Sequence, residues 1–430
     1  DGSTLDLHAA PDDSAAAVRG FGGTGAEADF RRFSAEAARL HRAFERPVMR
    51  SHRPDTFAVA AAVLRDPGLI PALLPAATLA GRLAGTFRDA RLAQLFGRYA
   101  TYVGGSPYHS PAVLGLIWET EAQGVWAVEG GMHGLARAMA ALAGARGARL
   151  RYGTQVERIV TDGGRVMGVA LADGEVLRAG HVIFNGDPAA LAAGLLGPDV
   201  TRAVPAAAVT PRSHSAWVWS FAARARGLPL AMHNVIFTAD PRAEFGAIAA
   251  GRMPDAATLY VCAQDRAGGY VPDGPERFEI ILNAPPTGRA DARPSEEEYD
   301  RCRTLTFDTL TRAGLSFDPL PGREALTGPA QFAAMFPGSQ GSLYGRSPHG
   351  LLAAFRRPGP ATRVPGLWLA GGGTHPGAGV PMATLSGMNA SAALISSLAR
   401  RASTSRSART AMPGGTSTGS PTTQAAPSRS

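Results

Sequence analysis

The fold is decided by residues 366–401, which read GLWLAGGGTHPGAGVPMATLSGMNASAALISSLARR. Within this stretch, residues 367–370 predict a short buried strand, 371–379 a glycine-rich turn, and 383–398 a helix of mostly small residues. The first amides of a helix have no partner inside it, and the helix dipole favours negative charge at that end. The stretch therefore predicts a cofactor held at a helix N-terminus. The alternative is a turn whose glycines serve only tight packing.

Residues 130–187 predict a separate stretch of α/β structure. The segment GGMHGLARAMAALAGARGARL is expected to form an amphipathic helix, with Leu135, Met139 and Leu142 on one face and glycines at its end. Short alternating runs follow, ARLRYG and then TQVERIVTDGGRVMGVALADGEVLRAGHVIFN, which Asp-Gly turns divide into strands. A helix, a three-stranded meander and the apolar strand HVIFN together indicate an α/β layer.

The rest of the chain predicts a helical region and a sheet. Residues 12–87 have a helical pattern, and one face carries apolar side chains at steps of three and four, namely Phe30, Phe33, Ala37, Leu40 and Phe44. Residues 213–285 contain the strand-like runs SAWVWSFAA, ATLYVCAQD and RFEIILNAP, spaced as in a mixed sheet. A helix is expected in SEEEYDRCRTLTFDTLTRAG, because Ser295 and Glu298 have the spacing of a capping box.

Residues 67–81, PGLIPALLPAATLAG, carry no charge and are interrupted by Pro67, Pro71 and Pro75. The segment is too short and too broken to cross a bilayer, which takes about 20 apolar residues. Two interpretations remain, a buried helical cap or a patch that dips into one face of a membrane.

Composition removes several classes of chemistry. The chain has 430 residues, of which 43 are basic and 35 acidic, and every basic residue is Arg. Without lysine there is no Schiff base and no P-loop. The net charge of +8 is diffuse, and no basic stripe with interleaved aromatics indicates nucleic acid. Residues 402–430 are small, polar and rich in Pro and Gly, which predicts a disordered tail.

Cysteine usage and the search for reactive groups give further limits. Cys262 and Cys302 lie far apart without metal-ligand spacing, so neither a disulfide framework nor a zinc site is supported, and a reducing compartment fits best. No triad spacing, HExxH or DxD pattern occurs, which argues against hydrolysis and metal catalysis. His375 is the only titratable residue in the glycine-rich turn, and the simpler expectation is that it packs and hydrogen-bonds that turn. No catalytic residue is assigned.

The segment GGGTHPGAGVPMATLSGMNAS resembles the C-terminal flavin motif of the carotenoid desaturase family, the phytoene desaturase-like branch of the FAD-dependent amine oxidase superfamily. Three other stretches share the resemblance, residues 98–142, 156–188 and 348–372. GVPMATLSG and the FRRPG run are most similar to the bacterial hydroxyneurosporene and methoxyneurosporene desaturases, which introduce the 3,4 double bond into 1-hydroxycarotenoids. The resemblance covers residues 1–400.

The resemblance implies an α/β fold in which a Rossmann-like FAD/NAD(P)-binding domain is interleaved with an α+β substrate domain. Residues 1–125 would form a helical cap of the substrate part, 126–200 an FAD-binding portion, 201–335 the substrate sheet and helix, and 336–401 the C-terminal FAD-binding portion. The family begins with an apolar strand and a GxGxxG turn that binds the FAD pyrophosphate. Here the glycines from Gly20 to Gly23 follow a charged, helix-like run instead of an apolar strand, so they are not interpreted as that turn. The chain, which begins DGSTLDLHAA, is therefore expected to start inside the fold, after about 80 upstream residues.

Carried over residue by residue, the resemblance implies a flavin site in the glycine-rich turn and at the start of the following helix. The expected contacts of the flavin are Gly372, Gly373, Thr374, His375, Pro376, Gly377, Gly379, Val380, Pro381 and Met382. Val156 would contact the adenine. Residues 129–132 would form a loop and helix start near the flavin, and Asn185 and Asp187 would close the last strand of the layer.

The implied function is FAD-dependent desaturation of a carotenoid, by hydride transfer from a CH–CH unit to flavin inside a dry tunnel. Candidates for the tunnel lining, each of which could equally be a core residue, are Trp118, Trp126, Trp217, Trp219, Phe221, Phe237 and Phe336. The water-insoluble substrate predicts a cytoplasmic protein attached peripherally to a membrane surface, and the sequence indicates no electron acceptor. Alternatives are a phytoene desaturase, a carotenoid isomerase, a retinol saturase-like enzyme or a polyene carrier without redox activity.

Overall fold

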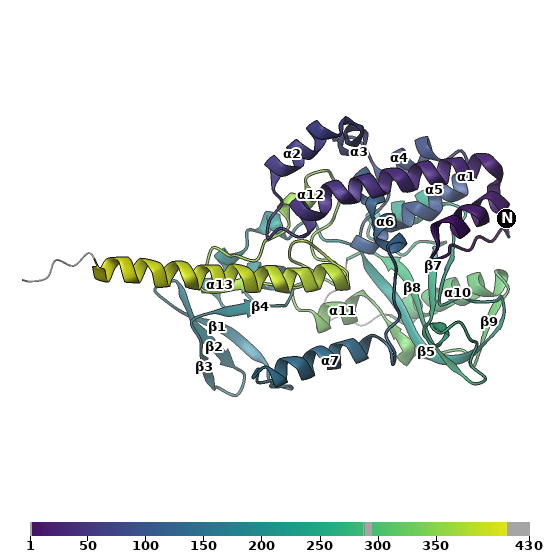
Figure 1. Ribbon diagram of the computed structural model, residues 1–430. Coiled ribbons are helices and arrows are strands. Elements are labelled where there is room, and N and C mark those ends of the chain that lie inside the picture. Colours follow the sequence, from purple (N-terminus) through teal and green to yellow (C-terminus); the bar gives the residue numbers. More distant parts are fainter. Residues whose placement is uncertain (1, 287, 289–294, 411–430) are drawn as a thin grey trace, which may run out of the picture.

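The computed structural model describes residues 2–286, 288 and 295–410 (Figure 1). Its first part is a helical cap, as the sequence predicts. The cap contains α1 (Pro11–Phe44), η1 (Glu45–Met49), α2 (Thr56–Arg65), η2 (Pro67–Leu69), α3 (Ile70–Leu73), α4 (Leu79–Thr86), α5 (Ala90–Gly97), η3 (Arg98–Val103), η4 (Ala112–Leu116) and α6 (Ile117–Ala122). The predicted apolar face of α1 is buried, and an aromatic core surrounds Phe33, whose ring centroid lies 4.6 Å from that of Phe96.

The second part is the α/β layer. It contains α7 (Met132–Ala145), β1 (Val156–Asp162), β2 (Arg165–Leu171), β3 (Val176–Arg178), β4 (Val182–Phe184), α8 (Pro188–Ala192), η5 (Pro198–Ala203) and η6 (Ala206–Ala208). The predicted meander is confirmed, because β1, β2 and β3 form a three-stranded antiparallel sheet in that order. The predicted strand in ARLRYG is wrong: residues 148–153 are not strand, and the three meander strands pair only with one another.

The third part is a six-stranded sheet with one covering helix. Its elements are β5 (Ser215–Gly227), β6 (His233–Ile236), α9 (Pro241–Ala249), β7 (Leu259–Ala263), η7 (Gln264–Arg266), β8 (Glu276–Ala284), α10 (Glu296–Arg312), β9 (Leu315–Asp318), η8 (Arg323–Ala325) and β10 (Leu326–Thr327). The order is β10-β5-β8-β7-β6, and β9 pairs with β5. All these pairs are antiparallel, so the expected mixed sheet is wrong. The predicted capping box of α10 is present.

One face of this sheet packs against α10 and forms the largest core of this part. The core includes Trp217 and Trp219 of β5, Ile280 of β8 and Leu310 of α10. The indole nitrogen of Trp219 donates a hydrogen bond to Thr306 of α10 (3.2 Å). Period-two alternation along the strands and a helical stripe on α10 explain this core, because each pattern presents its apolar side chains on one face.

The C-terminal part returns to the α/β layer. It contains α11 (Pro329–Met335), α12 (Ala353–Arg356), β11 (Leu367–Leu369) and α13 (Val380–Thr410). The predicted short strand is confirmed and fully buried. The helix begins earlier and ends later than expected, so residues 402–410 of the predicted tail are helical, and residues 411–430 lie outside the described residues. Figure 1 shows α13 alongside β4, with the meander below it.

Candidate functional site

The candidate flavin site lies where two parallel strands end. β11 pairs with β4, and Leu369 is opposite Phe184. Ala370 N continues the ladder by donating to Phe184 O (3.1 Å). Since parallel strands end at the same edge, the glycine-rich loop after β11 meets the loop that follows β4, and ligands of open α/β sheets bind at such edges. Two segments far apart in the sequence thus build one site.

The glycines of this loop serve two different purposes. A Cβ atom on Gly373 would lie 2.7 Å from Pro188 Cδ, so this glycine allows the two loops to pack. Gly377 and Gly379 have φ angles of +144° and +97°, which side chains disfavour, and a Cβ atom on Gly379 would meet nothing within 4 Å. The backbone at Gly379 is exposed and bare, which is what close contact with a flat ligand requires, whereas Gly377 is buried with its Cβ position 3.9 Å from Arg357.

His375 has a structural position in the loop. Its Nε2 lies 2.8 Å from Val48 O and 3.1 Å from Ser51 O, both at the end of η1. Carbonyl oxygens only accept hydrogen bonds, so Nε2 carries the proton. Burial lowers the pKa of His375, which favours the neutral ring. His375 therefore ties the loop to the helical cap, in agreement with the simpler expectation.

A buried arginine fixes the other side of the loop. Nη1 of Arg357 donates to Gly372 O and Tyr344 O (both 2.8 Å), and its Nη2 donates to Arg346 O (3.0 Å). Burial lowers the pKa of this guanidinium to about 10. A planar group with several fixed donors can hold three carbonyls at once, so Arg357 sets the shape of the loop.

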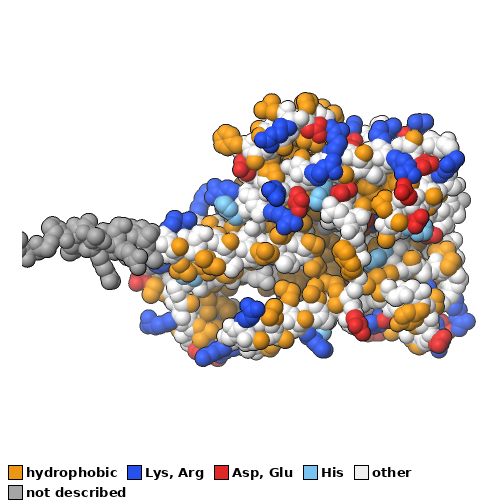
Figure 2. Space-filling model, in the orientation of Figure 1, with side chains coloured by type: hydrophobic (Ala, Val, Ile, Leu, Met, Phe, Trp, Pro, Cys, Tyr) orange, Lys and Arg blue, Asp and Glu red, His pale blue; other side chains and the backbone are white. Residues whose placement is uncertain are grey.

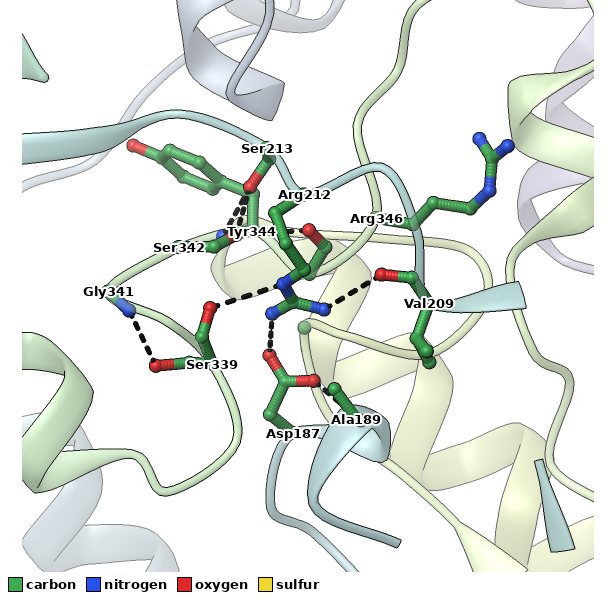
Figure 3. Close-up of polar contacts among 12 residues, drawn as sticks. Asp187, Ala189, Val209, Arg212, Ser213, Ser339, Gly341, Ser342, Tyr344 and Arg346 are labelled. Carbon is green, nitrogen blue, oxygen red and sulfur yellow. Dashed lines mark hydrogen bonds and ion pairs between the residues drawn. The ribbon is translucent and has the colours of Figure 1, made fainter. Parts of the chain in front are cut away.

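Arginines also give the site a positive character. Arg212 and Asp187 form an ion pair beneath the loop, and Asp187 Oδ1 also accepts from Ala189 N (2.8 Å) at the start of α8 (Figure 3). Arg346 and Arg357 donate to backbone carbonyls, and within the described part of the chain no carboxylate forms an ion pair with either of them. The region thus holds three guanidinium groups and, in Asp187, one carboxylate that pairs with one of them, and the excess positive charge favours an anionic ligand.

The predicted contacts differ in accessibility. Thr374 and His375 are buried inside the loop, whereas Gly379, Val380 and Pro381 are exposed at the start of α13. Gly372, Gly373, Pro376 and Met382 are half-buried, and Gly377 is buried. Ser386 Oγ of α13 accepts from Gly371 N (3.1 Å), which fixes the helix against the strand end. Gly379, Val380 and Pro381 are thus the predicted contacts that a ligand reaches most directly, and the contacts with flavin stay predictions.

Val156 and the turn at Gly130 and Gly131 are predicted site positions that lie outside the glycine-rich loop. Val156 starts β1, and the meander reaches β11 through Val166 N, which donates to Pro365 O (3.0 Å) before the strand begins. The contact of Val156 with the adenine of FAD stays a prediction. Gly130 and Gly131 form the expected turn before α7, with φ angles of +75° and +83°.

Sequence reasoning missed the arginines. Arg357 lies in the FRRPG run and Arg212 just before β5, but neither has a local pattern that assigns it a role. Their partners come from other segments, and only the burial of an Arg among backbone carbonyls identifies them. The one signal in the sequence was that Arg357 lies in the FRRPG run, shortly before the strand that leads into the glycine-rich turn.

The candidate tunnel aromatics divide into two groups. Four of them belong to hydrophobic cores, Trp118 in the cap and Trp217, Trp219 and Phe221 against α10, so the structure favours their alternative role as core residues. Trp126 and Phe336 are exposed and Phe237 is half-buried. Figure 2 shows the molecule hollowed between α6 above and α7 and α11 below, with apolar side chains around the hollow.

The loop fits a flavin. It offers bare backbone at Gly379, the N-terminus of a long helix, and a surplus of buried positive charge. Two side-chain atoms within the loop, Thr374 Oγ1 and His375 Nδ1, are buried without a hydrogen-bond partner among the described residues. These features define a site for a flat, partly anionic cofactor at the carboxyl edge of an α/β layer, as in flavin-dependent oxidoreductases.

Comparison with known proteins gives the same class. Residues 79–303 match the model of the family described as flavin containing amine oxidoreductase. The chain is 59% identical over 401 residues to the hydroxyneurosporene desaturase of Cereibacter sphaeroides, which covers 93% of this chain and 80% of the relative. The proteins of the same name from Rhodobacter capsulatus and Rubrivivax gelatinosus are 51% and 45% identical, over 92% and 97% of this chain and 79% and 80% of their own lengths.

The chain belongs to the flavin-containing amine oxidoreductase family and, within it, to the carotenoid desaturase branch. It is an oxidoreductase with a mixed α/β fold of that family.

Proposed function

We propose that this protein binds FAD and introduces the 3,4 double bond into a 1-hydroxy- or 1-methoxycarotenoid. The observation that carries the proposal is the high identity to hydroxyneurosporene desaturases over nearly the whole chain, combined with the cradle formed by the glycine-rich loop. FAD, when bound, accepts the hydride from a CH–CH unit of the substrate.

The residues of this chain hold and orient the cofactor. Arg357 keeps Gly372 in place, His375 anchors the turn to the cap, and the bare backbone at Gly379 permits contact with a flat ring. The buried guanidinium groups of Arg346 and Arg357 favour negative charge at the site. Because hydrogen bonds fix these two guanidinium groups before the reaction, they need not move when negative charge develops at the site.

The test is a substrate comparison. Purified, flavin-loaded protein is supplied with 1-hydroxyneurosporene, its methyl ether, or phytoene in separate vesicles, and polyene absorption is followed. We expect a red shift, from the lengthened conjugation, with the two oxygenated polyenes. A red shift with phytoene alone would indicate a phytoene desaturase. A change in the absorption spectrum without loss of hydrogen would indicate an isomerase, and tight binding without any reaction would indicate a carrier.

We also propose that the protein works in the cytoplasm at a membrane surface. On α2 and α3, four large apolar side chains are exposed, namely Phe57, Leu64, Ile70 and Leu74, and the first two are 89% and 82% exposed. Figure 2 shows these elements as an apolar region at the top of the molecule, next to basic side chains. Insertion would gain about 25 cal/mol for each Å² of apolar area buried.

Membrane insertion would be shallow. Among the described helices none is by itself long and apolar enough to span a bilayer; α2 followed by η2 and α3 passes only as a pair bent by 109°. Leu69 and Ala72 are buried in the cap core, as the first interpretation of the 67–81 segment expects, while the exposed Ile70 and Leu74 support the proposal of a membrane patch. Flotation with liposomes tests the proposal through the double variant Phe57→Asp, Leu64→Asp. Unchanged flotation would contradict it.

A further inference from the structure

The helices α2 and α3 form an exposed apolar surface, which we call the α2–α3 surface. Its exposed apolar side chains are those of Phe57, Leu64, Ile70 and Leu74. Phe57 and Leu64 lie two turns apart on one face of α2, whereas Val59 and Val63 on the opposite face pack against the cap core. α2 carries no charge before Arg65, and a helix that is apolar all round is normally buried on every side. The outer face of α2 therefore needs a partner that covers it.

The segment that contains this surface is rich in arginine. Residues 39–81 contain six arginines and three carboxylates. The three carboxylates are all engaged within the segment: Glu45 pairs with Arg50 (2.8 Å), Asp66 pairs with Arg39, and Asp55 accepts from the amide of Ala58 (3.0 Å) at the start of α2. The segment therefore carries an excess of positive charge that its own carboxylates do not balance.

Four of the six arginines are exposed and form no ion pair within the described part of the chain, namely Arg42, Arg46, Arg53 and Arg65. Three of them border α2. Arg65 is its last residue, Arg53 lies just before its start, and Arg46 belongs to η1, which is held against that start because Asp55 N donates to Pro47 O (2.8 Å). Figure 2 shows basic side chains beside the apolar region at the top of the molecule. The apolar surface and the unpaired positive charges are thus neighbours.

The chemistry of this surface fits a lipid whose headgroup is negatively charged. Helices that lie in a membrane interface bind through buried apolar area and through attraction between basic side chains and anionic lipids. The planar guanidinium group can donate two parallel hydrogen bonds to one phosphate. A bilayer without net charge would cover the apolar side chains and leave the positive charges unbalanced.

We propose that the α2–α3 surface binds bilayers of anionic lipid. Phe57, Leu64, Ile70 and Leu74 enter the boundary between headgroups and acyl chains. Arg46, Arg53 and Arg65 contact the headgroup phosphates. The inference rests on the proposed function, which attaches the protein to a membrane, and it adds the class of lipid that this membrane must contain.

The α2–α3 surface is joined to the flavin loop by the residues between η1 and α2. Besides the contacts of His375 Nε2 with Val48 O and Ser51 O, the side-chain amide of Asn389 in α13 donates to Ser51 O (3.3 Å). A Cβ atom on Gly359 would lie 3.3 Å from the carbonyl oxygen of the adjacent His52. Binding through α2 would therefore hold the flavin loop near the bilayer in which a water-insoluble polyene dissolves.

The experiment measures flotation of the flavin-loaded protein with two kinds of vesicle. One is phosphatidylcholine alone, and the other is an equal mixture of phosphatidylcholine and phosphatidylglycerol. We expect the parent to bind the mixed vesicles at least about 100-fold more tightly at low salt, since each basic residue at an anionic surface contributes about fivefold. High salt should remove most of this preference, because dissolved ions screen the charges.

The triple variant Arg46→Gln, Arg53→Gln, Arg65→Gln tests the arginines. We expect its binding to the mixed vesicles to fall roughly 100-fold, with little change on phosphatidylcholine alone. The double variant Phe57→Asp, Leu64→Asp should instead lose binding to both kinds of vesicle, because it removes the apolar contact.

A matched control removes the same number of charges elsewhere. Arg146, Arg149 and Arg178 are exposed and form no ion pair with a described residue. Figure 1 shows β3, which contains Arg178, on the opposite side of the molecule from α2. Replacement of these three residues by Gln should leave the preference for the mixed vesicles within about threefold of the parent, a small part of the fivefold expected for each contacting arginine. Flavin content and melting temperature confirm that each variant folds.

The outcomes separate the inference from the proposed function. Equal binding of the parent to both kinds of vesicle would overturn the inference and leave membrane attachment standing. Equal losses in the two triple variants would also overturn it, since net charge alone would then explain the preference. A parent that floats with neither kind of vesicle would refute the proposed membrane attachment itself, and with it the inference, and would indicate a protein partner for this surface.

Discussion

In the six-stranded sheet, neighbouring strands are antiparallel, the covering helix α10 follows soon after β8, and one face forms a continuous apolar core. In the α/β layer that holds the candidate flavin site, β4 and β11 pair in parallel although they lie far apart in the sequence, at Val182–Phe184 and Leu367–Leu369. There the loops are held by buried arginines rather than by apolar packing. Stability and cofactor geometry therefore have separate sources in this molecule: apolar packing stabilises the sheet, and hydrogen bonds from buried arginines shape the loops of the flavin site.

Breaking the sheet core is expected to have the largest effect on stability. Trp219 is completely buried between β5 and α10. Its replacement by Ala should lower the free energy of unfolding by about 3–5 kcal/mol, through lost apolar contact and the cavity left behind. Chemical denaturation measures the change. At low temperature the folded variant should still bind flavin, and loss of flavin without loss of stability would contradict the separation of the two sources.

Removing Arg357 should affect the flavin layer. Arg357→Met leaves three carbonyl oxygens, those of Gly372, Tyr344 and Arg346, without their buried donor. We expect a loss of about 2–3 kcal/mol in stability together with a strong loss of flavin, since an unpaired buried acceptor costs about 1–3 kcal/mol. Arg357→Lys tests the geometry, because an ammonium group keeps the charge but not the fixed fork of donors. Normal flavin content in both variants would show that the loop does not depend on this residue.

Acid should weaken the junction between the cap and the sheet. His214 lies beside His349 and Phe245, and burial, with a smaller contribution from His349 and His109, lowers its pKa to about 4. The unfolded chain binds this proton near pH 6.5, so stability falls as the pH drops from 6.5 toward 4. His214→Phe should remove about 2 kcal/mol of the difference in stability between pH 7.5 and pH 5. Equal pH dependence of variant and parent would contradict the account.

The smallest effect on stability is expected from the exposed apolar patch on α2. Phe57→Asp with Leu64→Asp should change the free energy of unfolding by less than about 0.5 kcal/mol, since both side chains lie outside the cores. Thermal melting measures this change. A large loss of stability would show that these side chains pack in the cap. As a control, Leu69→Asp alters a buried neighbour and should destabilise the cap strongly.

The sequence allowed much of the fold to be predicted, because period-two strands, a capping box and an apolar helix face are local patterns. The three meander strands, β11 and the buried face of α1 follow from such patterns. The family resemblance placed the segments of β4 and β11 in one FAD-binding part, but their parallel pairing was not predicted. The arginine contacts could not be predicted either, since each joins segments that local patterns do not relate.

The central claim, that the loop from Gly371 to Gly379 holds the flavin, is tested most directly by the flavin content of Gly377→Val. Gly377 is buried with a φ of +144°, and a Cβ atom there would lie 3.9 Å from the Arg357 guanidinium, so a branched side chain would strain the loop and disturb the residue that shapes it. The matched control is Gly274→Val, at a loop glycine without a strained φ and with nothing within 4 Å of its Cβ position. We expect the purified Gly377 variant to be folded and colourless, while the Gly274 variant keeps the yellow flavin. Full flavin occupancy in Gly377→Val would contradict the account.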